Sequence, residues 1–164
     1  MSHEIPVFAG AVECSAVLGR PLSYDEALSL IPEGSWLSTS RNWWYQGLVR
    51  ELCDTYASFD ELRYLTEVFA VVPAAELATR IQAIKRLITT IKENTEPFVA
   101  VTPWRGESVE EVRRCIEQAE VLRDLDDDCR YAFANFFSFL VSQVAALEEA
   151  QSAGKCLLYV QAQP

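Results

Sequence analysis

The chain has 164 residues, of which 50% are hydrophobic and 23% charged, and this combination is typical of one folded domain with a sizeable core. Acidic residues outnumber basic residues by 24 to 14, giving a formal net charge of −10 that argues against nonspecific binding to nucleic acid or to anionic lipid. The single histidine, His3, excludes sites built from several histidines, including most zinc sites.

The first quarter of the chain contains one clear helix signal. Residues 5–22 are apolar and rich in small side chains, and they predict an early strand or an extended arm. Ser23 and Glu26 have the Ser-x-x-Glu spacing of a capping box, in which the two residues satisfy free backbone N–H groups at the start of a helix. They predict a short helix over 24–31, which Pro32 ends.

Helical periodicity dominates the middle of the chain. Apolar residues recur every three or four positions over 40–57, which predicts a helix. Ser58 and Glu61 form a second capping box and predict another helix that continues up to Pro73. Over 73–93 the apolar residues follow the helical period most regularly, and basic residues occupy the opposite face, so this segment predicts an amphipathic helix.

Prolines and a glycine interrupt the helical pattern over 95–106, where 98–101 predicts a short strand or an extended packing segment. Ser108 and Glu111 form a third capping box, and the periodic apolar residues after it predict a helix up to residue 122.

The end of the chain is the most apolar part. Residues 129–151 predict a long helix of core character, with Gly154 as its C-cap glycine. Residues 156–160 predict a short buried strand, and the two apolar ends, 5–18 and 156–160, either pair as strands or cover the bundle.

These elements predict a mainly α fold. We expect residues 1–164 to form a single helical domain, arranged as a bundle of about five or six helices around the hydrophobic helix 131–147. If the two ends of the chain pair as strands, one short pair of strands accompanies the bundle.

Cysteine usage predicts the redox environment. The five cysteines cannot all pair within one chain, and no C-x-x-C spacing occurs that would indicate a zinc knuckle or a redox pair. Most lie among apolar neighbours, so we expect small buried thiols in a reducing cytosol. The chain shows neither an export signal nor an apolar run of membrane-spanning length, which also favours the cytoplasm.

A run of acidic residues is the densest group of charged side chains. It comprises Asp124, Asp126, Asp127 and Asp128, and it lacks the glycine and the closing glutamate of an EF-hand. Acidic residues at a helix N-terminus also stabilise the helix by themselves, so the run does not by itself predict a metal site. Its place in the most acidic third of the chain instead makes it a candidate surface for a basic partner.

Aromatic residues supply candidate anchors for such a partner. Trp43, Trp44 and Tyr45 are consecutive, and since adjacent helical residues point about 100° apart, they cannot all face one core. Trp43 and Tyr45 are therefore candidates for surface contacts, although the more ordinary use of all three aromatic residues is to seal the end of the bundle. Trp104 lies between a proline and a glycine in a predicted loop, where a partner can reach it.

No catalytic motif accompanies these features. Glycine-rich phosphate loops and a nucleophile motif of the G-x-S-x-G type do not occur. Pairs of glutamates at i, i+3 spacing, such as Glu107 with Glu110 and Glu117 with Glu120, leave open a small all-α, metal-dependent nucleotide hydrolase. Surface ion pairs on one helix explain the same spacing.

The sequence therefore predicts a non-catalytic, cytosolic binding protein with no cofactor and no metal. The profile is typical of a bacterial immunity protein or antitoxin, which occludes the active cleft of a cognate toxin. The predicted partner is a protein with a basic surface or cleft, rather than nucleic acid or a membrane. A secretion chaperone, an adaptor or a transcriptional antiactivator is the alternative, because these proteins also bind through helical faces and are often acidic.

Overall fold

The computed structural model describes residues 4–33, 35–40, 42–100, 108–119 and 132–161. Helices make up most of this part of the chain, so the mainly α class is confirmed. The α helices are α1 Cys14–Val17, α2 Tyr24–Leu30, α3 Asn42–Thr55, α4 Leu77–Glu93, α5 Thr95–Ala100, α6 Val109–Glu117 and α7 Ala132–Ser152. Two 3₁₀ helices, η1 Ala57–Thr66 and η2 Ala74–Glu76, lie between them.

A four-stranded antiparallel sheet accompanies the helices, in the order β2-β1-β4-β3. Its strands are β1 Glu4–Val12, β2 Trp36–Ser40, β3 Phe69–Val72 and β4 Cys156–Gln161. The central pair joins the two ends of the chain, with Val7 opposite Gln161 and Val12 opposite Cys156. Of the two arrangements left open for the terminal segments, they adopt pairing as strands, whereas the strands β2 and β3 were not predicted.

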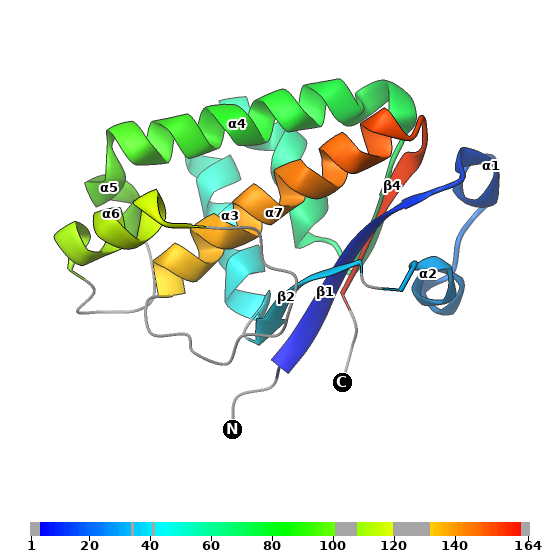
Figure 1. Cartoon of the computed structure of the whole chain (residues 1–164), viewed down its shortest axis with the longest axis horizontal. Coiled ribbons are helices and arrows are strands. Elements are labelled where there is room, and N and C mark those ends of the chain that lie inside the picture. Colours follow the sequence, from blue (N-terminus) through cyan, green and yellow to red (C-terminus); the bar gives the residue numbers. More distant parts are fainter. Residues whose placement is uncertain (1–3, 34, 41, 101–107, 120–131, 162–164) are drawn as a thin grey trace.

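The helices lie on both sides of this sheet (Figure 1). Helix α7 packs on β1 and β4 and against α4, while α1 and α2 lie on the opposite side, where α2 contacts β4. The predicted bundle around residues 131–147 is not confirmed, because α7 packs against a sheet as well as against helices. Its central role is nevertheless evident in the part described: Phe136, Phe137 and Phe139 are each at most 1% exposed.

Two hydrophobic cores result from this arrangement, one on each face of the sheet. On β4, Leu157 and Tyr159 face the larger core under α4 and α7, whereas Leu158 and Val160 face the smaller core under α1 and α2. Both faces of β4 are covered, so apolar residues follow one another without polar alternation. This explains why its sequence resembles a continuous apolar run.

The capping boxes have different outcomes. The Ser23 hydroxyl oxygen accepts a hydrogen bond from the Glu26 backbone N–H at 3.2 Å and begins α2 as predicted. Ser108 accepts from the Glu111 N–H at 3.4 Å at the start of α6. The predicted α-helix after Ser58 is wrong, because 57–66 form the 3₁₀ helix η1 and 69–72 form β3. Pairing with β4 favours the extended conformation of this Phe-Ala-Val-Val segment over its helical periodicity.

The segment after α4 is also corrected. Residues 98–101 were predicted to be extended, but residues 95–100 form the helix α5. Pro97 is compatible with this helix because it lies in the first turn, where backbone N–H groups have no helical partner. Phe98 is 2% exposed and belongs to the larger core, so its side chain packs this short helix against the rest of the fold.

The prediction of free, buried thiols is wrong for two cysteines. Cys14 and Cys156 form a disulfide, with a Cα–Cα separation of 5.2 Å. The strand register explains the pairing: Val12 lies opposite Cys156, and the chain turns into α1 at Cys14, two residues further on. Cys53 is a free, buried thiol as predicted, and Cys129 lies outside the described residues.

Within the described ranges, every helix is too short or too polar to span a lipid bilayer.

Candidate functional site

The residues predicted to bind a partner are not brought together by the described part of the structure. Trp104 and the acidic run Asp124, Asp126, Asp127 and Asp128 lie outside the described residues. Trp43 and Tyr45 lie in the first turn of α3, where only the backbone is described. Their role in binding stays a prediction.

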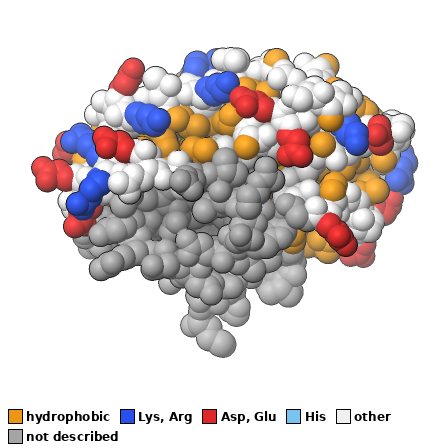
Figure 2. All heavy atoms as spheres, in the orientation of Figure 1, with side chains coloured by type: hydrophobic (Ala, Val, Ile, Leu, Met, Phe, Trp, Pro, Cys, Tyr) orange, Lys and Arg blue, Asp and Glu red, His pale blue; other side chains and the backbone are white. Residues whose placement is uncertain are grey.

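The described acidic side chains lie at the surface of the protein. None of them belongs to either core, and most are exposed. Several pair with cations: Arg63 contacts Asp60 and Asp54, and Lys85 contacts Glu148 at 3.0 Å. On the face shown in Figure 2, acidic and basic side chains are accordingly interspersed rather than separated into patches.

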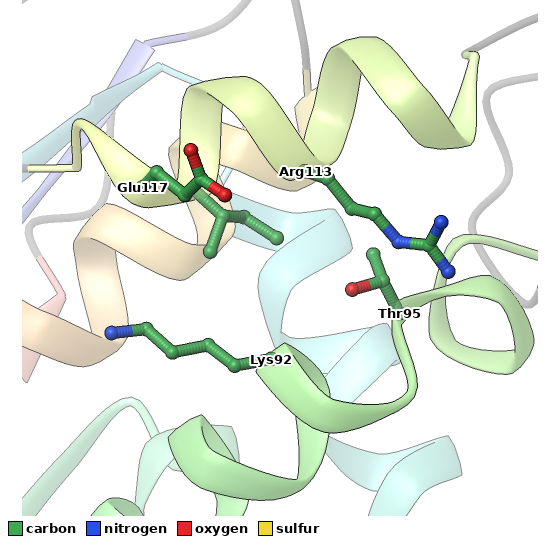
Figure 3. A pocket seen from close by; sticks show the side chains of 5 residues that line it. Lys92, Thr95, Arg113 and Glu117 are labelled. Carbon is green, nitrogen blue, oxygen red and sulfur yellow. The ribbon is translucent and has the colours of Figure 1, made fainter.

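A pocket lies where three helices meet. It has a volume of about 310 Å³, and its lining side chains come from the end of α4, the start of α5 and α6 (Figure 3). These side chains are Lys92, Thr95, Arg113, Ile116 and Glu117. The pocket exists because α4 stops at Asn94, whose φ of −146° and ψ of 74° are not helical, and the chain turns directly into α5.

The lining combines one buried, hydrogen-bonded side chain with three longer charged side chains. Thr95 is 1% exposed, and its hydroxyl donates a hydrogen bond to the Ile91 carbonyl oxygen at 2.8 Å, which leaves its oxygen free to accept one. The Lys92 ammonium lies 5.7 Å from the centre of the buried Phe137 ring, a cation–π geometry that restricts the lysine side chain. Arg113 and Glu117 stand one turn apart on α6.

Sequence reasoning did not identify this pocket. Lys92 is one of the basic residues opposite the apolar face of the helix predicted over 73–93, and Arg113 is close enough in sequence to Glu110 for a surface ion pair on one helix. The two residues are 21 positions apart, and no local motif indicates that the chain reverses between them. Only the packing of α6 beside the α4–α5 corner brings them to one cavity.

A second polar group is buried under α7. The Tyr64 hydroxyl donates to Oε1 of Gln143 at 3.3 Å, and the Tyr159 hydroxyl donates to the Leu65 carbonyl oxygen at 3.1 Å. Burial raises the pKa of both tyrosines, so both phenols stay neutral. Gln161 donates to the Tyr159 oxygen at 3.1 Å. These bonds connect η1 to α7 and β4.

The described residues contain no cluster of side chains that would support the metal-binding alternative. Among them, no group of three or more Asp, Glu, His or Cys side chains is close enough to hold a metal ion. Glu107 and Glu120, two of the four glutamates considered for such a site, lie outside the described ranges.

Comparison of the chain with models of protein families, with curated proteins and with solved structures finds no match.

Proposed function

We propose that this protein is a non-catalytic inhibitor of another protein, acting as an immunity protein or antitoxin that occludes the basic active cleft of a cognate bacterial toxin. The observation that supports the proposal is the net charge of −10 together with its location, since the described acidic side chains all lie outside the two cores. Such a surface attracts a basic partner and accelerates the encounter with it.

The proposed mechanism is occlusion. Asp124, Asp126, Asp127 and Asp128 would pair with arginine and lysine side chains of the partner's cleft. Trp43, Tyr45 and Trp104 would supply the apolar anchors, because buried aromatic side chains dominate the energetics of many protein interfaces. Inhibition of this kind needs no chemistry from the inhibitor itself.

The proposed site of action is the cytoplasm, but the disulfide weighs against that part of the proposal. Structural disulfides are rare in the reducing cytosol and common in oxidising compartments. The location is tested by trapping thiols in intact cells and then measuring whether Cys14 and Cys156 are paired. Free thiols at both positions would support a cytoplasmic location, and a quantitative disulfide would contradict it.

Association kinetics test the interface. The partner would be the protein encoded by the neighbouring gene, co-purified with this chain. Reversal of Asp126 and Asp127 to lysine should slow association at least tenfold at low salt and leave the melting temperature unchanged. Asp25→Lys with Glu33→Lys is the matched control, because it makes the same change in net charge at two exposed residues elsewhere. Equal rates for both double variants would show that Asp126 and Asp127 are not at the interface.

The stoichiometry separates the alternative functions. An immunity protein should be monomeric alone and form a 1:1 complex with a folded partner. A dimer that binds an unfolded partner would instead indicate a secretion chaperone.

A further inference from the structure

We propose that the pocket between α4, α5 and α6 binds a small acidic amino acid, in addition to any protein partner of this chain. The inference comes from the charges that line the pocket, which are two cations and one carboxylate around an apolar side chain. An acidic amino acid carries the complementary set, namely two carboxylates and one ammonium. Binding of such a ligand in this pocket does not depend on the proposed inhibitory function.

The three charged side chains of the pocket are not neutralised within the described part of the chain. Among the described residues Lys92, Arg113 and Glu117 make no ion pair, whereas five other cations in the same part of the chain are paired. All three are exposed at the pocket. Charged groups that line a concavity without neutralising one another favour a ligand that supplies the missing charges.

Their placement separates the pocket into two ends. Figure 3 shows Lys92 and Glu117 at one end and Arg113 beside Thr95 at the other. We assign the α-carboxylate of the ligand to Lys92 and its ammonium to Glu117. The side-chain carboxylate then reaches the Arg113 guanidinium, whose planar fork suits bidentate carboxylate binding.

The rest of the pocket fits the methylene part of such a ligand. Ile116 is 4% exposed and adds an apolar side chain to the lining. The volume of about 310 Å³ lies at the lower end of the range for small-molecule sites. A pocket of this size has room for a single amino acid.

Calorimetric titration of the full chain with four ligands tests the assignment. L-Glutamate and L-aspartate carry all three groups, glutarate lacks the ammonium, and L-glutamine lacks the second carboxylate. We expect saturable binding of at least one acidic amino acid, and binding at least tenfold weaker for glutarate and L-glutamine. No saturable heat from either acidic amino acid up to about 10 mM would overturn the proposal, as would equal binding of glutarate.

Variants then locate the binding. Lys92→Gln and Arg113→Gln should each weaken binding about tenfold or more, whereas Arg114→Gln, a neighbouring exposed cation that does not line the pocket, should not. Glu117→Gln should reverse the preference, so that glutarate binds at least as well as L-glutamate. A misfolded variant cannot produce that reversal. Unchanged affinity in Arg113→Gln, or an unchanged preference in Glu117→Gln, would contradict the assignment.

Discussion

Cys14 and Cys156 are joined by a disulfide although 142 positions separate them in the sequence. The bond links the start of α1 to the first residue of β4, beside the register pair Val12–Cys156 of the central strands. The disulfide and the β1–β4 hydrogen bonds therefore hold the same junction, one covalently and the other through the backbone.

Loss of this disulfide should lower stability without abolishing the fold. A cross-link that closes so long a loop restricts the unfolded chain, so we expect Cys14→Ser with Cys156→Ser to lower the free energy of unfolding by roughly 2–5 kcal/mol. Urea unfolding, with and without a thiol reductant, measures the effect. The reductant should shift the midpoint of the unaltered protein and leave that of the double variant unchanged. A midpoint insensitive to the reductant in both proteins would show that the bond contributes nothing.

Gly10 occupies a position where a side chain has no room. A Cβ atom there would lie 2.9 Å from Cβ of Ser35 and 3.0 Å from Cδ of Pro32, closer than carbon atoms ordinarily approach. We expect Gly10→Ala to destabilise the protein by about 1–3 kcal/mol, because the chain that leads into β2 must move away from β1. Thermal unfolding measures the loss, and combining Gly10→Ala with Ser35→Gly should recover part of it. No change in melting temperature for Gly10→Ala would contradict this packing.

The Tyr64–Gln143 hydrogen bond should show strong coupling between its partners. Nε2 of Gln143 already has no hydrogen-bond partner among the described residues, and Tyr64→Phe would remove the partner of Oε1 as well. We expect Tyr64→Phe to cost about 1–3 kcal/mol, whereas Tyr64→Phe with Gln143→Met should cost less, because the double variant leaves neither member of the pair unsatisfied. Denaturant unfolding of both single variants and the double variant completes the cycle. Additive losses would mean that the two side chains do not interact.

Glu26 should give α2 a measurable pH dependence. The Arg20 guanidinium, and then the Ser23 hydroxyl, hold the pKa of this carboxyl below its ordinary value of 4.5. Because the pKa is lower in the folded protein, the stabilisation is present above the ordinary value and disappears as the pH falls through the lowered one. The stability advantage of the unaltered protein over Glu26→Gln should therefore be constant near neutral pH and shrink in acid. An advantage that persists at the lowest pH would contradict this account.

Local signals predicted the elements that form from their own residues. The Ser23 and Ser108 capping boxes and the period of 77–93 each require neighbours only a few positions away, and each was confirmed. By contrast, β3 is extended because β4 pairs with it, and the sequence around Phe69 contains no information about that distant strand. The Cys14–Cys156 bond could not be predicted for the same reason, since it depends on the β1–β4 register.

The two candidate sites also differ in whether their residues are close together in the sequence. The lining of the pocket comes from helices that meet only in the folded chain, so Lys92 and Arg113 looked like ordinary surface cations in sequence. The acidic run 124–128 was visible at once because its members are adjacent. Adjacency identifies a cluster of charges, but it does not reveal what the cluster faces.

Survival of cells tests the central proposal most directly. The protein encoded by the neighbouring gene would be expressed alone, with this chain, and with the Asp126→Lys, Asp127→Lys double variant, and viable cells would be counted. We expect killing by the neighbour alone, rescue by the unaltered chain and weaker rescue by the double variant. A neighbour that is harmless when expressed alone, or one that kills equally in the presence of this chain, would contradict an immunity function.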